Sequence, residues 1–318
     1  MSESSDVKYS VVVPVYRNRD SLPELVERLQ ALADRRNGRL EAVFVVDGSP
    51  DDSIEVLKKV LADGRLNAQI VALSRNFGAF TAVRTGLSVI RGEYVGVVAA
   101  DLQEPPEMLD GFFDALESGT CDIVLGQREG RNDPAVTSLF ARSYWWLYRR
   151  LINREIPAGG IDVFGCTAEV ANRLAAFRET HTSLVGLLYW IGFRRTYLPY
   201  VREARRHGKS AWTFRKKLRY LFDSIYAFTD LPIVILQTIG FFGVLASVLL
   251  GVIVFLGWLT GNVSQPGYTP LMIVILATSS AILLGLGVVG SYVARAYENS
   301  KGRPTSIVAS HDFVGRRD

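Results

Sequence analysis

The segment from Asp101 to Pro106 (DLQEPP) places a carboxylate and an amide two positions apart, directly after an apolar run. Oxygen ligands of this kind suit Mg²⁺ and Mn²⁺, and Mg²⁺ is commonly bound by one carboxylate together with substrate phosphates. An Asp that precedes a proline-started helix is also a common N-cap. The segment therefore predicts either a cation site formed by Asp101 and Gln103 or the start of a helix.

Polar side chains also follow three other apolar runs, and the residues concerned are Asp47, Arg75, Asn76 and Arg128. The Asp47 carboxylate is suited to a ligand hydroxyl or a base edge. Its loop, Asp47-Gly-Ser-Pro, equally has the composition of a turn ahead of an N-cap. Acidic, amide and cationic groups in successive loops favour one shared binding site over a series of unrelated turns.

Five short apolar runs alternate with amphipathic helical patterns in the first 127 residues. The runs are Tyr9–Val13, Ala42–Val46, Gln69–Leu73, Tyr94–Ala99 and Asp122–Leu125, and Pro14 is expected to end the first. Strands that are apolar on both faces and separated by single helices predict an α/β fold with a mostly parallel sheet and helices on both faces. Right-handed crossovers bring the loops after such strands to one edge, where open α/β sheets bind ligands. We therefore expect the polar loops to meet at that edge.

The charge of the chain is unevenly distributed. The chain has 318 residues, of which 48% are hydrophobic and 21% charged, and this composition excludes a disordered or collagen-like protein. Residues 202–219 hold eight basic and one acidic side chain, whereas the net charge of the whole chain is +4. A basic patch beside an apolar segment is typical of a site for anionic lipid headgroups or phosphates. No nucleic-acid-binding motif accompanies the patch, so nucleic acid is not an expected partner.

Residues 231–294 contain no Asp, Glu, Lys, Arg or His. A Gly- and Pro-containing break at 261–270 divides them into spans of about 232–259 and 271–293, each long enough to cross a bilayer. Basic residues flank only the outer ends of the pair, so both termini are expected in the cytoplasm and the protein in the inner membrane. Residues 213–230 predict an amphipathic helix that lies on the membrane or, alternatively, packs on the sheet.

The chain is expected to divide at these composition changes. Residues 1–212 would form a cytoplasmic domain, because the N-terminus lacks the apolar region of a signal peptide. Residues 213–230 would form the interfacial helix and residues 231–294 the transmembrane hairpin. Residues 295–318 would form a cytoplasmic tail.

Several of these segments together resemble family 2 glycosyltransferases of the GT-A fold. The resemblance is carried by VVVPVYRNRDSL, VVDGSPDDS, SRNFG, AADLQEPPE, GQR and RRHGKSAW, in that order. Within the family the chain looks like the polyprenyl-phosphate sugar synthases, the branch of dolichyl-phosphate mannose synthase and bactoprenol glucosyltransferase. The tail from Gly290 to Pro304 is similar to the G-E-Y-x-x-R-x-Y-x-E…R-P segment of the bacterial members. The resemblance extends from about residue 9 to residue 308.

The resemblance implies a role for each matching position. Nucleotide-sugar binding is implied for Pro14, Tyr16, Asn18, Asp47, Arg75, Asn76 and Asp101. Binding of Mg²⁺ or Mn²⁺ is implied for Asp101 and Gln103. Contact with the lipid phosphate is implied for Arg128, Arg142, Arg205 and Ser210. The implied catalytic residues are Asp101, Asp162 and Arg128.

Three positions depart from the family pattern. Asn18 stands where a Glu is common, Val46 replaces the first of a pair of Asp residues, and Ala99 replaces an Asp two positions before Asp101. Cation binding is therefore expected to rest on Asp101 and Gln103 alone. The departures leave the identity of the sugar donor open.

The resemblance implies inverting transfer of a sugar from a nucleotide sugar to the phosphate of a polyprenyl phosphate at the cytoplasmic membrane face. UDP-hexose, such as UDP-glucose, and undecaprenyl phosphate are the expected substrates, with UDP-N-acetylhexosamine or GDP-mannose as alternative donors. The expected assembly is a homo-oligomer, and a tetramer is the preferred form.

Two other classes of protein share the catalytic fold. A processive polysaccharide synthase normally has more membrane spans and a Q-x-x-R-W segment, which this sequence lacks. A non-catalytic membrane scaffold would keep the fold and lose the chemistry. Retention of Asp101, Gln103 and Arg128 favours an enzyme.

Overall fold

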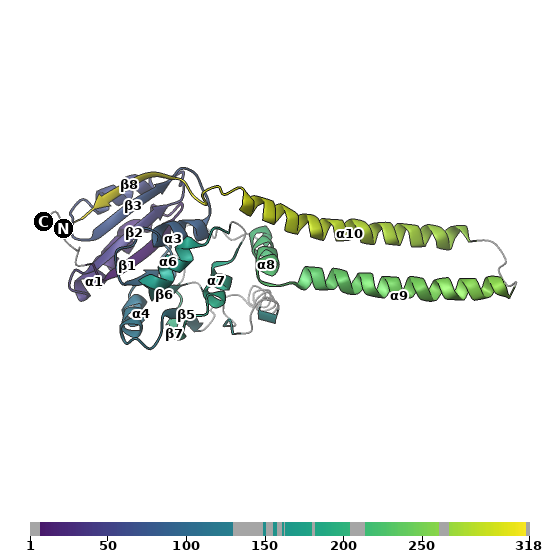
Figure 1. Cartoon of the computed structure of the whole chain (residues 1–318). Coiled ribbons are helices and arrows are strands. Elements are labelled where there is room, and N and C mark those ends of the chain that lie inside the picture. The colour runs from purple at the N-terminus through teal and green to yellow at the C-terminus, as the bar shows by residue number, and fades with distance from the viewer. Residues whose placement is uncertain are drawn as a thin grey trace.

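The structure is a computed structural model that describes residues 7–129, 149–150, 155–157, 161, 163–179, 182–203, 214–260 and 267–315. An α/β domain carries two long helices that extend away from it side by side (Figure 1). The first and last described residues of the chain both lie in the α/β domain.

The described residues form one mixed sheet with the strand order β7-β5-β6-β4-β1-β2-β3-β8. Its strands are β1 (Tyr9–Val15), β2 (Leu40–Val46), β3 (Asn67–Leu73), β4 (Tyr94–Val97), β5 (Ile123–Glu129), β6 (Phe164–Thr167), β7 (Arg195–Val201) and β8 (Val308–Val314). The pairings within β4-β1-β2-β3 and between β5 and β7 are parallel, whereas β6 and β8 are antiparallel to their neighbours. The prediction of a mostly parallel sheet is confirmed.

Helices cover both faces of the sheet, and each face has its own hydrophobic core. One face carries α1 (Leu22–Arg35), α2 (Ser53–Val60) and α4 (Met108–Glu117). The other carries α3 (Ala79–Leu87), α6 (Ala168–Ala176), α7 (Leu184–Trp190) and α8 (Phe214–Phe228). This two-sided arrangement is the α/β fold with helices on both faces that the sequence predicts.

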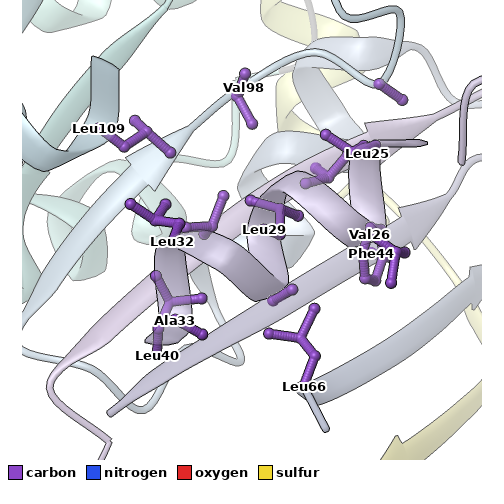
Figure 2. Close-up of a cluster of buried hydrophobic side chains, with 14 of the residues drawn as sticks. Leu25, Val26, Leu29, Leu32, Ala33, Leu40, Phe44, Leu66, Val98 and Leu109 are labelled. Carbon is purple, nitrogen blue, oxygen red and sulfur yellow. The ribbon is translucent and has the colours of Figure 1, made fainter. Parts of the chain in front are cut away.

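The first helix illustrates why the chain folds this way. Leu22, Leu25, Leu29 and Leu32 recur at helical spacing, and all four side chains are fully buried. In Figure 2 the apolar face of α1 lies over β2, with Phe44 among its neighbours. Burying each leucine contributes about 2 kcal/mol to stability.

The expectation that Pro14 ends the first strand is wrong, because β1 continues through it to Val15. Val12 O accepts from Val98 N on the β4 side, whereas Val15 O accepts from Asp47 N on the β2 side. Alternate residues of a strand point their backbone groups to the same side, so Pro14 faces the β4 side. The β1–β4 ladder has already ended at Val12, so the missing N–H of proline removes no strand pairing there.

The last described element is a strand that the sequence analysis did not predict. The expected tail, 295–318, instead begins as the last turns of α10 (Tyr268–Ser300), and β8 then pairs antiparallel with β3 at the sheet edge. His311 Nε2 lies 2.8 Å from Oε1 of the buried Gln69, and Lys58 Nζ lies 2.8 Å from the Asp312 carboxylate. The sheet domain therefore contains chain segments from both sides of the long helices (Figure 1).

Two apolar helices, α9 (Leu231–Leu259) and α10, expose large hydrophobic side chains such as Phe241 (67%) and Leu283 (69%). Within the described residues, one segment, Ala277–Ser300, is long and apolar enough to cross a membrane. A second candidate consists of Tyr220–Phe228 and Leu231–Gly243, which meet at an angle of 74°. The predicted amphipathic helix, residues 213–230, is observed as α8, and Leu221 and Ile225 pack it on the sheet, the second of its two expected placements.

Candidate functional site

The loops that follow β1, β2, β3 and β4 meet at the edge of the sheet formed by the carboxyl ends of these parallel strands, as the parallel pairing requires. Three hydrogen bonds connect these loops: Arg17 N to Ser49 Oγ (2.8 Å), Phe77 N to Asp47 Oδ1 (2.6 Å) and Ser21 Oγ to Ala100 O (2.6 Å). The expectation that the polar loops gather at this edge is confirmed for the loops after β1, β2, β3 and β4. The edge is the candidate active site.

The loop after β1 holds the predicted residues Tyr16 and Asn18 in a tight turn. Asn18 Oδ1 accepts from Tyr16 N at 3.2 Å, and Arg17 adopts the left-handed conformation with φ 58°. This conformation is uncommon for a residue other than glycine, and the hydrogen bond of Arg17 N to Ser49 supports it. The described contact of Asn18 therefore shapes the loop, while Tyr16 remains half-buried at the edge.

Asp47 is buried, with 2% of its surface exposed. Its carboxylate oxygens accept from the backbone N–H groups of Phe77 (2.6 Å) and Gly78 (2.8 Å). Burial raises the pKa of Asp47, although these two amides and the charge of Arg75 act in the opposite direction. In the described structure Asp47 thus holds the loop after β3 in place.

Arg75 and Asn76 lie in that loop and are exposed. The Arg75 guanidinium lies 4.0 Å from the centre of the Phe77 ring, within cation–π distance, and its positive charge is exposed to solvent. Asn76 Nδ2 donates to Asp47 O at 3.2 Å. The loop after β3 therefore presents a cationic group, and it is hydrogen-bonded to both the backbone carbonyl and the carboxylate of Asp47.

Gly48 is required where these two loops cross, because its φ is +55° and a Cβ there would lie 2.2 Å from Arg75 C. We expect Gly48→Ala to lower the free energy of unfolding by well over the roughly 1–2 kcal/mol of left-handed strain alone. Gly119→Ala is the matched control, since Gly119 has φ +68° and open space around its Cβ position. Chemical denaturation of both variants measures the difference, and equal losses would contradict this account.

Asp101 follows β4 and is half-buried at the edge. The alternative that it caps a helix is wrong, because α4 begins at Met108 with Glu107 at its N-cap position. Asp101 Oδ1 instead accepts from Gln103 N at 3.3 Å. Between them the buried Leu102 has φ 56°, a strained conformation for a bulky residue and one that occurs preferentially at functional sites.

Gln103 is bound by the chain segment that leaves β7. Its Oε1 accepts from Arg202 Nη2 at 2.8 Å, and its backbone carbonyl accepts from Glu203 N at 2.8 Å. Arg202 Nε lies 3.3 Å from the carboxylate of Glu104, which is 2% exposed. Sequence analysis placed Arg202 only in the basic patch, because no sequence signal connects residues almost a hundred positions apart.

Arg28 joins three elements beside this loop. It donates two hydrogen bonds to the Glu107 carboxylate, at 2.8 and 2.7 Å, and one to Glu203 at 3.2 Å. The Arg28 guanidinium lowers the pKa of Glu107. Helix α1, the start of α4 and the end of β7 are thereby held together around the Asp101–Gln103 loop.

Arg128 lies within β5, in register with Tyr200 of β7, and is half-buried. The strand continues to Glu129, four residues beyond its predicted end, so Arg128 is a strand residue and not a loop residue. Arg128, in β5, and Arg202, directly after the neighbouring strand β7, thus lie at the same end of the sheet. The other predicted positions, namely Arg142, Asp162, Arg205 and Ser210, lie outside the described residues.

The chemistry of the donor set decides which kind of cation site the edge can form. Asp101 and Gln103 supply two oxygen-bearing side chains. Within the described ranges, no group of three or more His, Cys, Asp and Glu side chains is placed to hold a metal ion. These donors therefore fit a Mg²⁺ or Mn²⁺ ion whose coordination is completed by substrate phosphates and water, and they do not form a self-sufficient protein site.

Residues 10–180 match the family described as "Glycosyl transferase family 2". The chain is 31% identical over 304 residues to an uncharacterized glycosyltransferase of Synechocystis sp., with 95% of each chain covered. It is 30% identical to the undecaprenyl-phosphate 4-deoxy-4-formamido-L-arabinose transferase of Edwardsiella ictaluri (97% and 95% covered). It is 27% identical to the bactoprenol glucosyl transferase of Shigella phage SfV (95% and 98% covered).

Among solved structures, the chain is similar to glucosyl-3-phosphoglycerate synthase from Mycobacterium tuberculosis in complex with Mn²⁺, UDP-glucose and phosphoglyceric acid. That similarity has a TM-score of 0.47 and 16% identity, and covers 64% of this chain and 73% of the other. The family match covers more than half of the chain, and the Synechocystis relative is similar over nearly all of it. The chain belongs to glycosyltransferase family 2 and is a glycosyltransferase.

Proposed function

We propose that this glycosyltransferase transfers a sugar from a nucleotide sugar to the phosphate of a polyprenyl phosphate at a membrane surface. The observation that carries the proposal is that the Asp101–Gln103 loop after β4 and Arg128 near the end of β5 lie at the same end of a sheet whose chain continues into exposed apolar helices. Full-length relatives named as undecaprenyl-phosphate and bactoprenol sugar transferases support the lipid acceptor. UDP-glucose is our first choice of donor, with UDP-N-acetylhexosamine and GDP-mannose as alternatives.

The proposed reaction forms a bond between an acceptor phosphate oxygen and the anomeric carbon and breaks the bond to the nucleoside diphosphate. A phosphate monoester has a second pKa near 6, so at neutral pH the acceptor already carries the negative charge of a nucleophile. The chain therefore needs no strong base at the site. A single displacement gives a product with inverted anomeric configuration.

The residues at the edge would bind and orient the two substrates. Asp101 and Gln103 would hold a Mg²⁺ or Mn²⁺ ion, which when bound neutralises the charge of the leaving diphosphate. Arg128 would hold the acceptor phosphate in line with the anomeric carbon. Tyr16 and Arg75 would line the nucleotide, in loops kept in shape by Asn18 and Asp47. Pro14 and Asn76 would complete that lining.

The membrane arrangement is part of the proposal. We place α9 and α10 across the bilayer as a hairpin, with α8 at the interface and the sheet domain in the cytoplasm. Two observations support this placement: the exposed apolar side chains of both helices, and the return of the chain to the sheet domain as β8 (Figure 1). The Asp223–Arg295 ion pair at 2.8 Å joins α8 to the polar end of α10. A homo-oligomer stays a prediction.

An acceptor series tests the substrate class. We expect purified protein, supplied with nucleotide sugars and Mn²⁺, to glycosylate undecaprenyl phosphate and not undecaprenol, because the alcohol lacks the anionic nucleophile and the charge that Arg128 would bind. Thin-layer chromatography of radiolabelled lipid measures both reactions. Equal labelling of alcohol and phosphate would contradict the proposed chemistry, as would transfer to water-soluble sugars alone.

A further inference from the structure

The segment at the end of β7 contacts the predicted cation loop on one side and continues along the chain toward the predicted acceptor segment on the other. Arg202 follows the last residue of β7, and the predicted phosphate-binding residue Arg205 comes three positions later. From this placement and the contacts of Arg202 we propose that Arg202 is a positioning residue that fixes the Asp101–Gln103 loop for cation binding. The inference rests on the proposed function, because that function assigns the cation to this loop.

Three contacts attach the loop to the end of β7. Arg202 Nη2 donates to Gln103 Oε1 at 2.8 Å, Arg202 Nε lies 3.3 Å from Glu104 Oε1, and Glu203 N donates to Gln103 O at 2.8 Å. The side chain and the backbone of Gln103 are thus held by consecutive residues of one segment. Arg28 of α1 donates to the Glu203 carboxylate at 3.2 Å and so connects that segment to α1.

The amide of Gln103 gains a defined orientation from this arrangement. An amide can turn over and exchange its oxygen with its NH₂ group at little steric cost, but only the oxygen can accept a hydrogen bond. Arg202 has donors and no acceptor, so it selects the orientation in which the oxygen faces the guanidinium. Because an amide oxygen has two lone pairs, accepting from Arg202 does not by itself prevent it from binding a cation. Arg202 therefore sets which atom Gln103 can present.

The charge of Arg202 is balanced locally. Glu104 is 2% exposed and lies within ion-pair distance of Arg202, so the pair places little net positive charge next to the proposed cation. Removing Arg202 would take its positive charge away from the buried Glu104 carboxylate. This change favours rearrangement of the loop. The strained backbone of Leu102, between Asp101 and Gln103, makes the loop geometry dependent on such support.

The test measures cation binding without turnover. Mn²⁺ is titrated into the full-length protein in detergent with UDP, and in parallel with GDP, and free Mn²⁺ is followed by electron paramagnetic resonance. Loss of a residue that hydrogen-bonds a metal ligand typically weakens metal affinity by about 10- to 100-fold. We expect Arg202→Gln to raise the Mn²⁺ dissociation constant within this range and Arg202→Lys to raise it less. Arg194→Gln is the matched control, because Arg194 precedes the other end of β7 and pairs with Asp122 at the surface.

Two further measurements separate positioning from folding. Thermal unfolding identifies variants that are simply destabilised, and we expect Glu104→Gln combined with Arg202→Gln to bind Mn²⁺ better than Arg202→Gln alone, because the buried charge is then removed. Excess Mn²⁺ should restore sugar transfer by Arg202→Gln.

Unchanged or tighter Mn²⁺ binding in folded Arg202→Gln would overturn the positioning role, as would absence of Mn²⁺ binding by the wild-type protein. If Mn²⁺ binds as expected but no lipid is glycosylated, the proposed function fails and the role of Arg202 in cation binding stands.

Discussion

Asp101→Ala is expected to reduce sugar transfer by about a thousand-fold or more, because it removes the carboxylate that we assign to the cation. The fold should persist, since Asp101 is half-buried and lies in a loop outside the strands and helices. Initial rates with undecaprenyl phosphate and saturating Mn²⁺ measure the loss, and circular dichroism verifies folding.

Asp52→Ala is the matched control for this variant. Asp52 lies in the neighbouring loop after β2, its carboxylate is 75% exposed, and its ion pair with Arg19 is long at 3.7 Å. A surface pair of this kind contributes little to stability, so near-normal transfer is expected. Near-normal transfer by Asp101→Ala itself would remove the cation role from the loop.

Truncation after Pro304 is expected to cause the largest loss of stability, because it removes β8 from the edge of the sheet. The loss includes the strand pairing with β3, the His311–Gln69 contact and the Thr85–Ser306 hydroxyl contact at 2.7 Å. We expect the midpoint of thermal unfolding to fall by about 10 °C, equivalent to a few kcal/mol in a domain of this size. The uncovered edge of β3 should also promote aggregation.

Truncation after Gly315 is the control for this experiment, because it keeps every residue of β8. Differential scanning fluorimetry and size-exclusion chromatography in detergent compare the two proteins. An unchanged midpoint after removal of residues 305–318 would show that β8 contributes nothing to the stability of the sheet.

The elements with strong periodic patterns could be predicted from the sequence. Helix α1 is one example, since its four leucines recur at helical spacing and all are buried. The gathering of Asp47, Arg75 and Asp101 at one edge could likewise be predicted, because parallel strands with right-handed crossovers leave no other arrangement. Local patterns and chain topology were sufficient for these predictions.

Features that depend on distant parts of the chain could not be predicted. Strand β8 contains Ser, His and Asp among seven residues and finds its partner more than 230 positions earlier. Arg202 meets Gln103 only because β7 lies beside β5 and ends near the loop after β4. The expectation that Pro14 ends the first strand was wrong for a related reason, since the effect of a proline depends on which neighbouring strand its backbone faces. Each case requires knowledge of the strand order, which no local pattern contains.

The central claim is lipid-phosphate glycosylation, and it is tested most directly by mass spectrometry of the product lipid. Purified protein is incubated with undecaprenyl phosphate, Mn²⁺ and one donor at a time: UDP-glucose, UDP-N-acetylglucosamine, UDP-galactose or GDP-mannose. Our account predicts one glycosylated undecaprenyl phosphate that disappears with EDTA and with Asp101→Ala. Binding of nucleotide sugars without any glycosylated lipid from any donor would contradict it.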